Sequence, residues 1–427
     1  MEPEKKRKKK QKLSALENAS PSLSKMEPET KKKKKKQKLT TSESASPSLA
    51  KMEPEEKEIN VVNAMNKQSD VAMFLAEKVI SAVAKNSNFV FSPASINAVL
   101  TMVAASSEEE SLRSFIFSIL RSSSMDELNA VFREVATVVK SGGPKISAVN
   151  GVWMEQSLSL NPSLKDFFEN FFKASFAQVD FRFKGEEVRK EVNAWASRHT
   201  NDLIQNILPH GSVTSDTDVI YGNALYFKGA WEHTFPKSLT RDEEFHLLNG
   251  TSVSVPFMES TRMKYVESYD GFKVLKLPFA QSGDTDRKFS MYFYLPEAND
   301  GLDDLVKRMA STSGFLDSHI PSQKVILGKF GIPKFKIEFG FEASKAFSEM
   351  KLDSVSLHHK ALVEIDEDGA EAAVVTKGGP RGRRTYIKRT YIDFVADHPF
   401  VVLIREDYTG TVLFVGQIFD PSKSVST

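Results

Sequence analysis

Apolar residues along the chain follow two spacings, which predict strands in some segments and helices in others. Short runs rich in Val, Ile, Phe and Tyr predict strands at 146–154, 218–228, 253–258, 264–277, 289–295, 325–338, 357–366 and 400–419. Apolar residues spaced three and four apart predict helices at about 126–140, 162–173, 186–206, 302–310 and 342–350. Strands and helices are therefore interspersed, and the sequence predicts a mixed α/β (α+β) fold that is rich in strands.

Two further helices are expected near the beginning of the folded part. Ser69 is placed to cap a helix whose apolar positions begin at Val71 and recur at helical spacing. Ser92 followed by Pro93 predicts the start of the next helix, since proline at the first helical position loses no hydrogen bond. The apolar run 94–105 predicts that this second helix is buried.

One long segment, residues 367–397, departs from both patterns and joins two strand-like runs. It begins with small residues and continues as a basic loop with several Gly and Pro; loops of this length inside a domain are functional or disordered. From 370 to 383 the even positions are small and uncharged, whereas the odd positions carry every charge. This segregation favours a segment that becomes a strand with one buried face, and the alternative is chance alternation in a low-complexity loop.

Residues 1–58 form a separate region with a duplicated unit. MEPEKKRKKKQKL…ENASPSLSK is followed by MEPETKKKKKKQKL…ESASPSLAK and by a third MEPE. The region holds 17 Lys and Arg against 10 Asp and Glu, whereas the rest of the chain holds 41 against 46. With few core-forming residues it is expected to be a disordered tail before a folded domain at 59–427. The blocks Lys5–Lys12 and Lys31–Lys38 resemble nuclear-localisation signals, or a patch that binds nucleic acid or an acidic membrane.

Composition narrows the class of protein. A chain of 427 residues with 40% hydrophobic content can bury one large core. No run of eighteen apolar residues predicts a membrane span, and the absence of cysteine excludes disulfides, thiolate metal sites and a cysteine nucleophile. The N-terminus lacks the pattern of a secretory signal, so we expect the protein in the nucleus, the cytoplasm or both.

No motif in the sequence indicates catalysis or a cofactor. There is no nucleotide-binding loop, GxSxG elbow, HExxH pair or spaced carboxylate pair, and the eight histidines show no metal-ligand spacing. The glycines of GGPRG (378–382) lack the lysine and the following helix of a phosphate-binding loop. His359 could be a catalytic base or a buried, hydrogen-bonded histidine. We therefore expect a protein that is not an enzyme and that uses no metal or cofactor.

Nine motifs, in order along the chain, resemble those of serpins of the plant (Z) type. They are NFVFSPASI (88–96), NGVW (150–153), VNAWASRHT (192–200), NALYFKGAW (223–231), FHLLNGTSVSVPFM (245–258), YDGFKVLKLP (269–278), IPKFKIEF (332–339), HKALVEIDEDGAEAA (359–373) and DFVADHPFVVLI (393–404). The resemblance covers residues 59–421. It implies a serpin fold with three β-sheets, about eight or nine helices and an exposed reactive-centre loop at about 367–393.

The resemblance also implies a mechanism and a reactive bond. In serpins a target protease attacks the loop and forms an acyl-enzyme, and the cut loop then enters the central sheet and traps the protease. Counting fifteen positions from the hinge glycine, as in the family, places the reactive bond at Arg383–Arg384. Arginine there implies a trypsin-like serine protease or an arginine-preferring cysteine protease as the partner of a monomeric inhibitor. The hinge that inserts first would comprise Glu367, Gly369, Ala370, Glu371, Ala372, Ala373, Val374, Val375 and Thr376.

Five residues outside the loop match serpin positions that hold the central sheet closed, the shutter and the breach. Ser92, Ser95, Asn223 and His359 match polar residues that cross-link strands where the sheet must part. Each of their hydrogen bonds would be worth a net of about 1 kcal/mol. Trp231 matches the tryptophan at the top of the sheet, where insertion begins, and a plain core aromatic would be compatible with that role.

Three features of the sequence count against inhibition. Val374 faces inward where serpins generally have a smaller residue, and Pro380, also inward, cannot donate to a central ladder. The chain is also short between Met350 and Leu357. Slow insertion would let hydrolysis win and make the protein a substrate. The alternative is a non-inhibitory serpin-fold binding protein, possibly nuclear and associated with nucleic acid; a hydrolase, without a nucleophile and base constellation, is a third reading.

Overall fold

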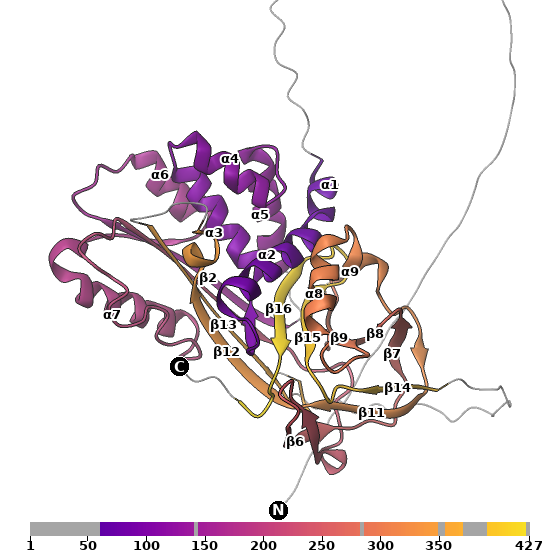
Figure 1. Cartoon of the computed structure of the whole chain (residues 1–427). Helices are drawn as coiled ribbons and strands as arrows, with labels where there is room; N and C mark the ends of the chain where they lie inside the picture. Colours follow the sequence, from indigo (N-terminus) through magenta and orange to yellow (C-terminus); the bar gives the residue numbers. More distant parts are fainter. Residues whose placement is uncertain (1–59, 141–143, 282–285, 349–354, 370–390, 424–427) are drawn as a thin grey trace, which may run out of the picture. The chain divides into compact units, whose positions relative to one another are not determined.

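The computed structural model describes residues 60–140, 144–281, 286–348, 355–369 and 391–423, which contain three β-sheets with helices packed around them (Figure 1). One sheet has the strand order β12-β13-β4-β2-β3, the second β1-β16-β15-β9-β8-β7-β10 and the third β14-β11-β6-β5. This confirms the expected mixed fold with three sheets. In the described ranges, no helix has the length and apolar composition of a membrane span.

The helices gather mainly at one end of the described domain, where α2, α3, α4 and α5 lie together, while α7 lies along the five-stranded sheet (Figure 1). Their bounds are α1 Val61–Asn66, α2 Gln68–Val83, α3 Pro93–Ser106, α4 Glu110–Ile119, α5 Met125–Lys140, α6 Pro162–Asp166, α7 Phe181–His199, α8 Leu302–Ser311, α9 Phe315–Ser318 and α10 Ala343–Ala346. A π-helical turn, Phe167–Phe171, continues α6, and a 3-10 turn spans Lys237–Leu239.

The strands agree with most of the expected runs. Their bounds are β1 Phe89–Phe91, β2 Lys145–Glu155, β3 Ser175–Val179, β4 Val219–Lys228, β5 Arg241–His246, β6 Ser252–Met258, β7 Lys264–Tyr269, β8 Phe272–Pro278, β9 Phe289–Pro296, β10 Lys324–Val325, β11 Leu327–Pro333, β12 Phe335–Glu342, β13 Val355–Ile365, β14 Ile392–Val395, β15 Phe400–Glu406 and β16 Val412–Ile418. The expected run 264–277 is a hairpin of two strands, because Gly271 takes a φ of +80° in the turn between them.

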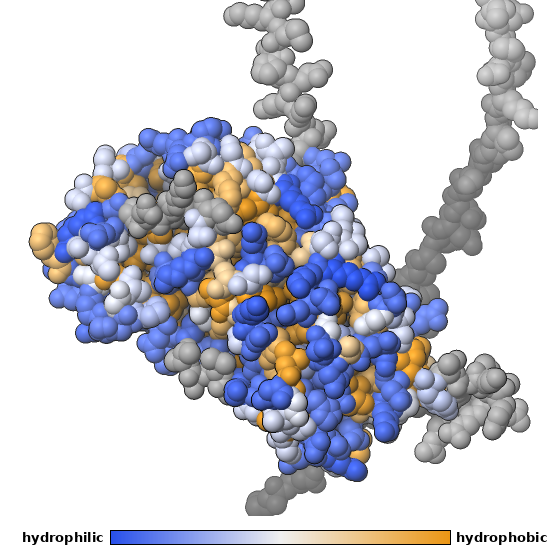
Figure 2. All heavy atoms as spheres, in the orientation of Figure 1, coloured by the Kyte–Doolittle hydropathy of each residue, from blue (hydrophilic) through white to orange (hydrophobic). Residues whose placement is uncertain are grey.

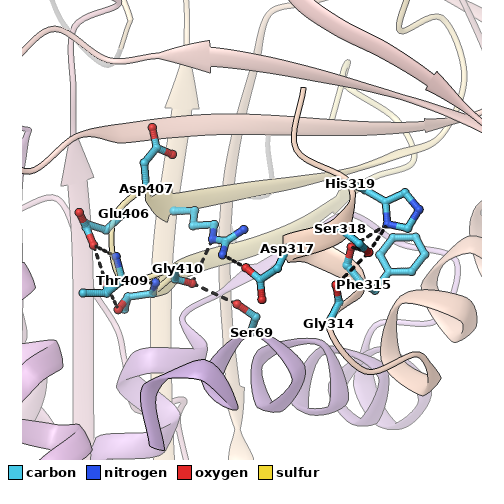
Figure 3. A network of polar contacts seen from close by, with 12 residues as sticks. Ser69, Gly314, Phe315, Asp317, Ser318, His319, Glu406, Asp407, Thr409 and Gly410 are labelled. Atoms are coloured by element: carbon cyan, nitrogen blue, oxygen red, sulfur yellow. Dashed lines mark hydrogen bonds and ion pairs between the residues drawn. The ribbon is translucent and has the colours of Figure 1, made fainter. Parts of the chain in front are cut away.

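The two serines expected as helix caps differ in the structure. The Ser92 hydroxyl oxygen accepts a hydrogen bond from the Ser95 amide at 3.1 Å, and Pro93 opens α3 as predicted. The prediction for Ser69 is wrong, because this residue lies inside α2. Its buried hydroxyl donates instead to the carbonyl oxygen of Gly410 at 3.2 Å, so it ties the helix to the β15–β16 hairpin (Figure 3).

The same hairpin is held by charged side chains (Figure 3). The Arg405 Nε donates to the Gly410 carbonyl at 3.1 Å, and its guanidinium also pairs with Asp317 of α9. The fully buried Glu406 carboxylate accepts the Thr409 amide hydrogen at 2.7 Å. These bonds close the turn between two strands of the seven-stranded sheet. The face of the domain seen in Figure 2 is mainly hydrophilic and is interrupted by hydrophobic patches.

One face of the five-stranded sheet is covered by α7. Trp195 of the helix packs edge-on against Trp153 of β2, with ring centroids 4.9 Å apart. A side chain at Gly151 or Gly222 would put its Cβ within 2.3 Å or 2.9 Å of the Trp153 ring, so both strands need glycine under this indole. The buried Glu155 accepts the Phe181 amide hydrogen at 2.7 Å, which fixes the start of α7 at the end of β2.

Candidate functional site

The centre of the five-stranded sheet is a parallel pair of strands, β4 and β13, which we call the seam. Eight residues of β13 pair in register with β4, from Val355 opposite Val219 to Leu362 opposite Tyr226. The outer neighbours, β12 and β2, are antiparallel to them. A segment that turns back after β13 would therefore run antiparallel to both strands of the seam. One parallel ladder, the slightly weaker kind, could be replaced by two antiparallel ones.

A buried group of polar residues, which we call the latch, crosses the seam near its middle. His359 of β13 lies opposite Asn223 of β4, and the His359 Nδ1 is 2.9 Å from the Asn223 Oδ1. The Ser92 amide donates to the His359 Nε2 at 3.0 Å. The latch therefore joins both strands of the seam to the beginning of α3, and it brings together three of the residues expected from the sequence.

His359 is neutral in this setting, and neither ring nitrogen is available to a substrate. Burial lowers the pKa of His359 to about 3, and the side chain is only 1% exposed. Its Nε2 accepts the Ser92 amide, so the proton lies on Nδ1 and is donated to the Asn223 carbonyl oxygen. Of the two readings of this residue, the structure favours the buried, hydrogen-bonded histidine over the catalytic base.

The latch continues across the sheet to β2. The Asn223 Nδ2 donates to the Asn150 Oδ1 at 2.8 Å, and the two asparagines face each other in the β2–β4 register. Ser95 is also buried. It takes part in the latch through its backbone amide, which donates a hydrogen bond to the Ser92 hydroxyl oxygen. Sequence reasoning missed Asn150, although its position in NGVW, opposite NAL, could have indicated a pair.

At the end of the seam, the turn after β4 holds residues 366–369, where β13 passes into the loop. The buried Trp231 donates its indole Nε1 hydrogen to the Asp366 carbonyl at 2.9 Å and its amide hydrogen to the Asp368 carbonyl at 3.2 Å. The Phe235 amide donates to the Glu367 carbonyl at 2.8 Å. We call these contacts the clamp. Trp231 is thus more than a core aromatic, because it fixes the point from which the loop departs.

Glu367 is the charged anchor of the clamp. Its carboxylate, buried with the residue only 6% exposed, accepts hydrogen bonds from Lys334 at 2.9 Å and from Thr240 at 2.7 Å. Burial alone would raise the pKa of Glu367, but these two hydrogen bonds hold it below its usual value. Lys334 and Thr240 were missed from the sequence, because both lie far from Glu367 along the chain and in unremarkable local patterns.

Gly369, the last described residue before the loop, is a position where only glycine fits. Its φ is +109°, and it bridges Ala230 in the turn after β4. A Cβ here would lie 2.4 Å from the Gly229 carbonyl oxygen and 2.7 Å from the Ala230 Cα. The sequence suggested a small residue for insertion into a sheet; the structure adds that the backbones of two turns touch at this point.

Several expected site residues lie outside the described ranges. These are the reactive bond Arg383–Arg384, the hinge residues Ala370, Glu371, Ala372, Ala373, Val374, Val375 and Thr376, the inward Pro380, most of the short segment after Met350, and the tail 1–58. Among the described residues, no group of three or more His, Cys, Asp or Glu is arranged to hold a metal ion. The described site therefore consists of a sheet seam, a latch across its middle and a clamp at its end.

Comparison with known proteins agrees with this arrangement. The family model described as serpin (serine protease inhibitor) matches residues 66–421. Serpin-Z2 of Arabidopsis thaliana is 63% identical over 424 residues, which is 98% of this chain and 97% of that protein. A probable non-inhibitory serpin-Z5 of the same plant is 61% identical over 440 residues, 99% and 100% of the two chains.

A solved structure supports the same assignment. AtSerpin1 of Arabidopsis in its native stressed conformation has a TM-score of 0.78 and 44% sequence identity, and the match covers 86% of this chain and all of that one. Both the extent of the family match and the identities far exceed what a shared fold alone would give. The chain belongs to the serpin family, among its plant Z-type members.

Proposed function

We propose that this protein inhibits an arginine-specific protease as a suicide substrate. Serpins as a family inhibit proteases. In the proposed reaction the protease cuts the Arg383–Arg384 bond, and the segment after Gly369 inserts between β4 and β13. The observation that carries the proposal is the parallel seam, whose two strands end beside the clamp from which the loop departs. An inserted strand gains hydrogen bonds on both sides without any change in strand direction.

The dimensions of a strand support the trapping step. Fifteen residues from Gly369 to Arg383, at about 3.3 Å each, span about 50 Å, enough to carry an attached protease past the whole seam. Arginine at the cut bond favours a specificity pocket with a carboxylate, as in trypsin-like serine proteases and arginine-preferring cysteine proteases. The same proposal has the inhibitor acting as a monomer, because the loop and the seam belong to one chain.

Incubation with trypsin tests the proposal. The expected product is a complex that survives SDS, with its covalent bond to Arg383. Arg383→Ala removes the preferred bond and should abolish the complex, whereas Arg381→Ala, two residues away, should leave it. Cleavage at Arg383 with no SDS-stable complex would overturn the inhibitory proposal for trypsin-like enzymes.

The sequence departures define a second test on the same gel. Val374 and Pro380 would face into the seam, where extra methyl groups cost about 1 to 3 kcal/mol and a proline cannot donate. If they stall insertion, the protein is cleaved as a substrate, and the double variant Val374→Ala, Pro380→Ala should raise the fraction trapped. The matched change Val375→Ala, at an outward position, should have little effect.

A second candidate function is a non-inhibitory binding protein, possibly nuclear. It is favoured by the relative described as probably non-inhibitory and by the basic blocks Lys5–Lys12 and Lys31–Lys38. In this proposal residues 1–58 are a separate tail that binds nucleic acid or an import receptor. Retention of the whole chain on immobilised DNA or RNA should fall steeply with salt and vanish for a chain beginning at Glu58. Equal retention of both chains would contradict a role for the tail.

A further inference from the structure

Lys264, the first residue of β7, is a buried cation without an anionic partner. The residue is only 6% exposed, and its backbone pairs with Val325 of β10. Within the described ranges, no carboxylate or hydrogen-bond acceptor contacts its ammonium group. Lysine is almost never fully buried unless it is paired, because removing the charge from water is costly. Glu232 attracts the ammonium group electrostatically but forms no ion pair with it, so the positive charge is only partly compensated.

Two aromatic rings provide part of the missing compensation. The Lys264 Nζ lies 4.5 Å from the Phe235 ring centroid and 5.6 Å from that of Phe330, and these rings stack at 5.9 Å with an interplanar angle of 6°. Cation–π contacts of this kind offset only part of the cost of burying the charge. Burial, with the positive charges of Arg262 and Lys324, lowers the pKa of Lys264 to about 8, so the group is still mostly charged at pH 7.

Lys264 lines a cavity of about 20 Å³ at the side of the clamp. A volume of about 10 to 15 Å³ holds one water-sized particle, so this cavity has room for one but not for an organic ligand. Its rim includes Met263 and Glu232, which are exposed, so a small solute can reach it. Trp231 and Phe235 of the clamp form part of the wall.

Among the lysines that line the cavity, Lys264 has no ion pair with a described residue, and Arg262 nearby adds a further positive charge. Lys276 pairs with Asp407 at 2.8 Å, and Lys324 makes a longer pair with Glu232, with Nζ and Oε2 3.6 Å apart. Lys264 has no corresponding carboxylate within the described residues. Two lysines, one unpaired and one loosely paired, therefore lie at a cavity of single-particle size.

We propose that this cavity binds one small monovalent anion of halide size, held by Lys264 and Lys324. The anion supplies the negative partner for Lys264, which forms no ion pair with a carboxylate of the described residues. The Phe235 ring lies under the Lys264 ammonium group, and the Phe235 amide donates a hydrogen bond to the Glu367 carbonyl oxygen. The site therefore adjoins the point where the reactive loop begins. Binding stabilises the intact folded chain, because the cavity does not exist in the unfolded chain.

The proposal includes a dependence on pH with a definite sign. The anion binds the charged form of Lys264, which is lost as the pH rises through the folded-state pKa of about 8. Arg262, Lys324 and Glu232 act on the charge of Lys264, and Lys276 and His233 line the same cavity. Anion affinity should therefore be highest below pH 7 and fall about tenfold for each pH unit above 8.

Thermal unfolding of the whole chain tests the site. At equal ionic strength, sodium chloride should raise Tm by about 1 to 3 °C over sodium gluconate, whose anion is too large, and the effect should saturate. Lys264→Met, of similar volume, should remove the difference. Lys336→Gln, which changes an exposed lysine paired with Glu364, is the matched control and should retain it. Equal Tm in both salts for the unmodified chain would overturn the proposal.

A second measurement does not depend on the variant's folding. Crystals of the whole chain grown in sodium bromide at pH 6.5 should show an anomalous peak between Lys264 and Lys324. An empty cavity there, with bromide bound elsewhere or nowhere, would overturn the proposal. Neither readout involves a protease, so the anion site can fail while the inhibitory function stands, and the reverse.

Discussion

The seven-stranded sheet and the five-stranded sheet are built in different ways, and the outer strand β3 of the second has no buried position. Every neighbouring pair in the seven-stranded sheet is antiparallel, and β9, β15 and β16 are buried at every position. The five-stranded sheet has a parallel seam at its centre, and a histidine and an asparagine face each other across it. Apolar side chains pack against both sheets, and exchangeable hydrogen bonds also cross the middle of the second.

The difference teaches where a sheet can be parted. Separating β9 from β15 would expose continuous apolar surface, at about 25 cal/mol for each Å². Separating β4 from β13 would also uncover buried side chains such as Leu225 and Leu357. It would break a parallel ladder and a few polar bonds, each worth a net of about 1 kcal/mol, and an added strand can restore these hydrogen bonds. In the proposed mechanism the seven-stranded sheet, which we call the framework, stays fixed, and the seam is the part that changes.

Cleavage of the loop should give the largest change in thermal stability. No change would contradict the proposed difference between the two sheets. An inserted strand adds about ten or more backbone hydrogen bonds, so Tm should rise by more than about 10 °C after cutting at Arg383. Differential scanning calorimetry of intact and cut protein measures the change. Identical melting temperatures would mean that the seam is as permanent as the framework.

A cavity in the framework should be costly in both states. Leu403→Ala in β15, where the side chain is 1% exposed, should lower the free energy of unfolding by about 2 to 5 kcal/mol in both intact and cut protein. Leu248→Ala, at a side chain 44% exposed, is the matched control and should cost far less. Denaturant titration reads both. A loss in the intact form alone would show that the framework also rearranges.

Removal of the latch histidine should be milder. His359→Leu leaves the Ser92 amide and the Asn223 side chain without their partner, at a cost of about 1 to 3 kcal/mol in the intact protein. The same change should speed insertion, read as a larger trapped fraction with trypsin. His210→Leu, at an exposed histidine, should change the free energy of unfolding by less than about 0.5 kcal/mol. An unaltered free energy of unfolding in His359→Leu would show that the latch does not stabilise the intact protein.

The smallest expected effect is a pH dependence of the same residue. The folded-state pKa of His359, about 3, lies below its usual 6.5, so the unfolded chain binds the proton first as the pH falls. Stability from the neutral histidine is full above about pH 7 and declines below 6.5. Between pH 7.5 and 6 the loss should be about 1 kcal/mol or less. It should be absent in His359→Leu, and an equal loss there would assign it to other groups.

Much of the fold follows from local sequence. Ser92 with Pro93 marks the start of α3, and the continuous apolar runs at 289–295 and 400–419 mark central strands of the seven-stranded sheet. The predictions missed or misplaced elements where the tertiary role of a segment is not visible in its local sequence pattern. Strand β5, RDEEFH, lies at a sheet edge with mostly exposed side chains and has no apolar alternation, and Ser69 is used for a distant carbonyl rather than for a cap.

The candidate site was predictable only in part, because its contacts join residues far apart in the chain. The resemblance identified Ser92, Asn223, Trp231 and His359. The structure brings Ser92, Asn223 and His359 together. Asn150, Lys334 and Thr240 carry no local signal; each gains its role only when two sheets or two turns meet. Pairing register, rather than residue type, decides which polar groups share the seam.

The clamp at Gly369 has a consequence for how such a protein can vary. Because the chain leaves the framework at a point set by backbone contact with Gly229 and Ala230, whatever follows starts from the same place and in the same direction. Under the proposed function, the choice of target would depend on the loop residues that follow this pivot, whereas structural integrity depends on the framework.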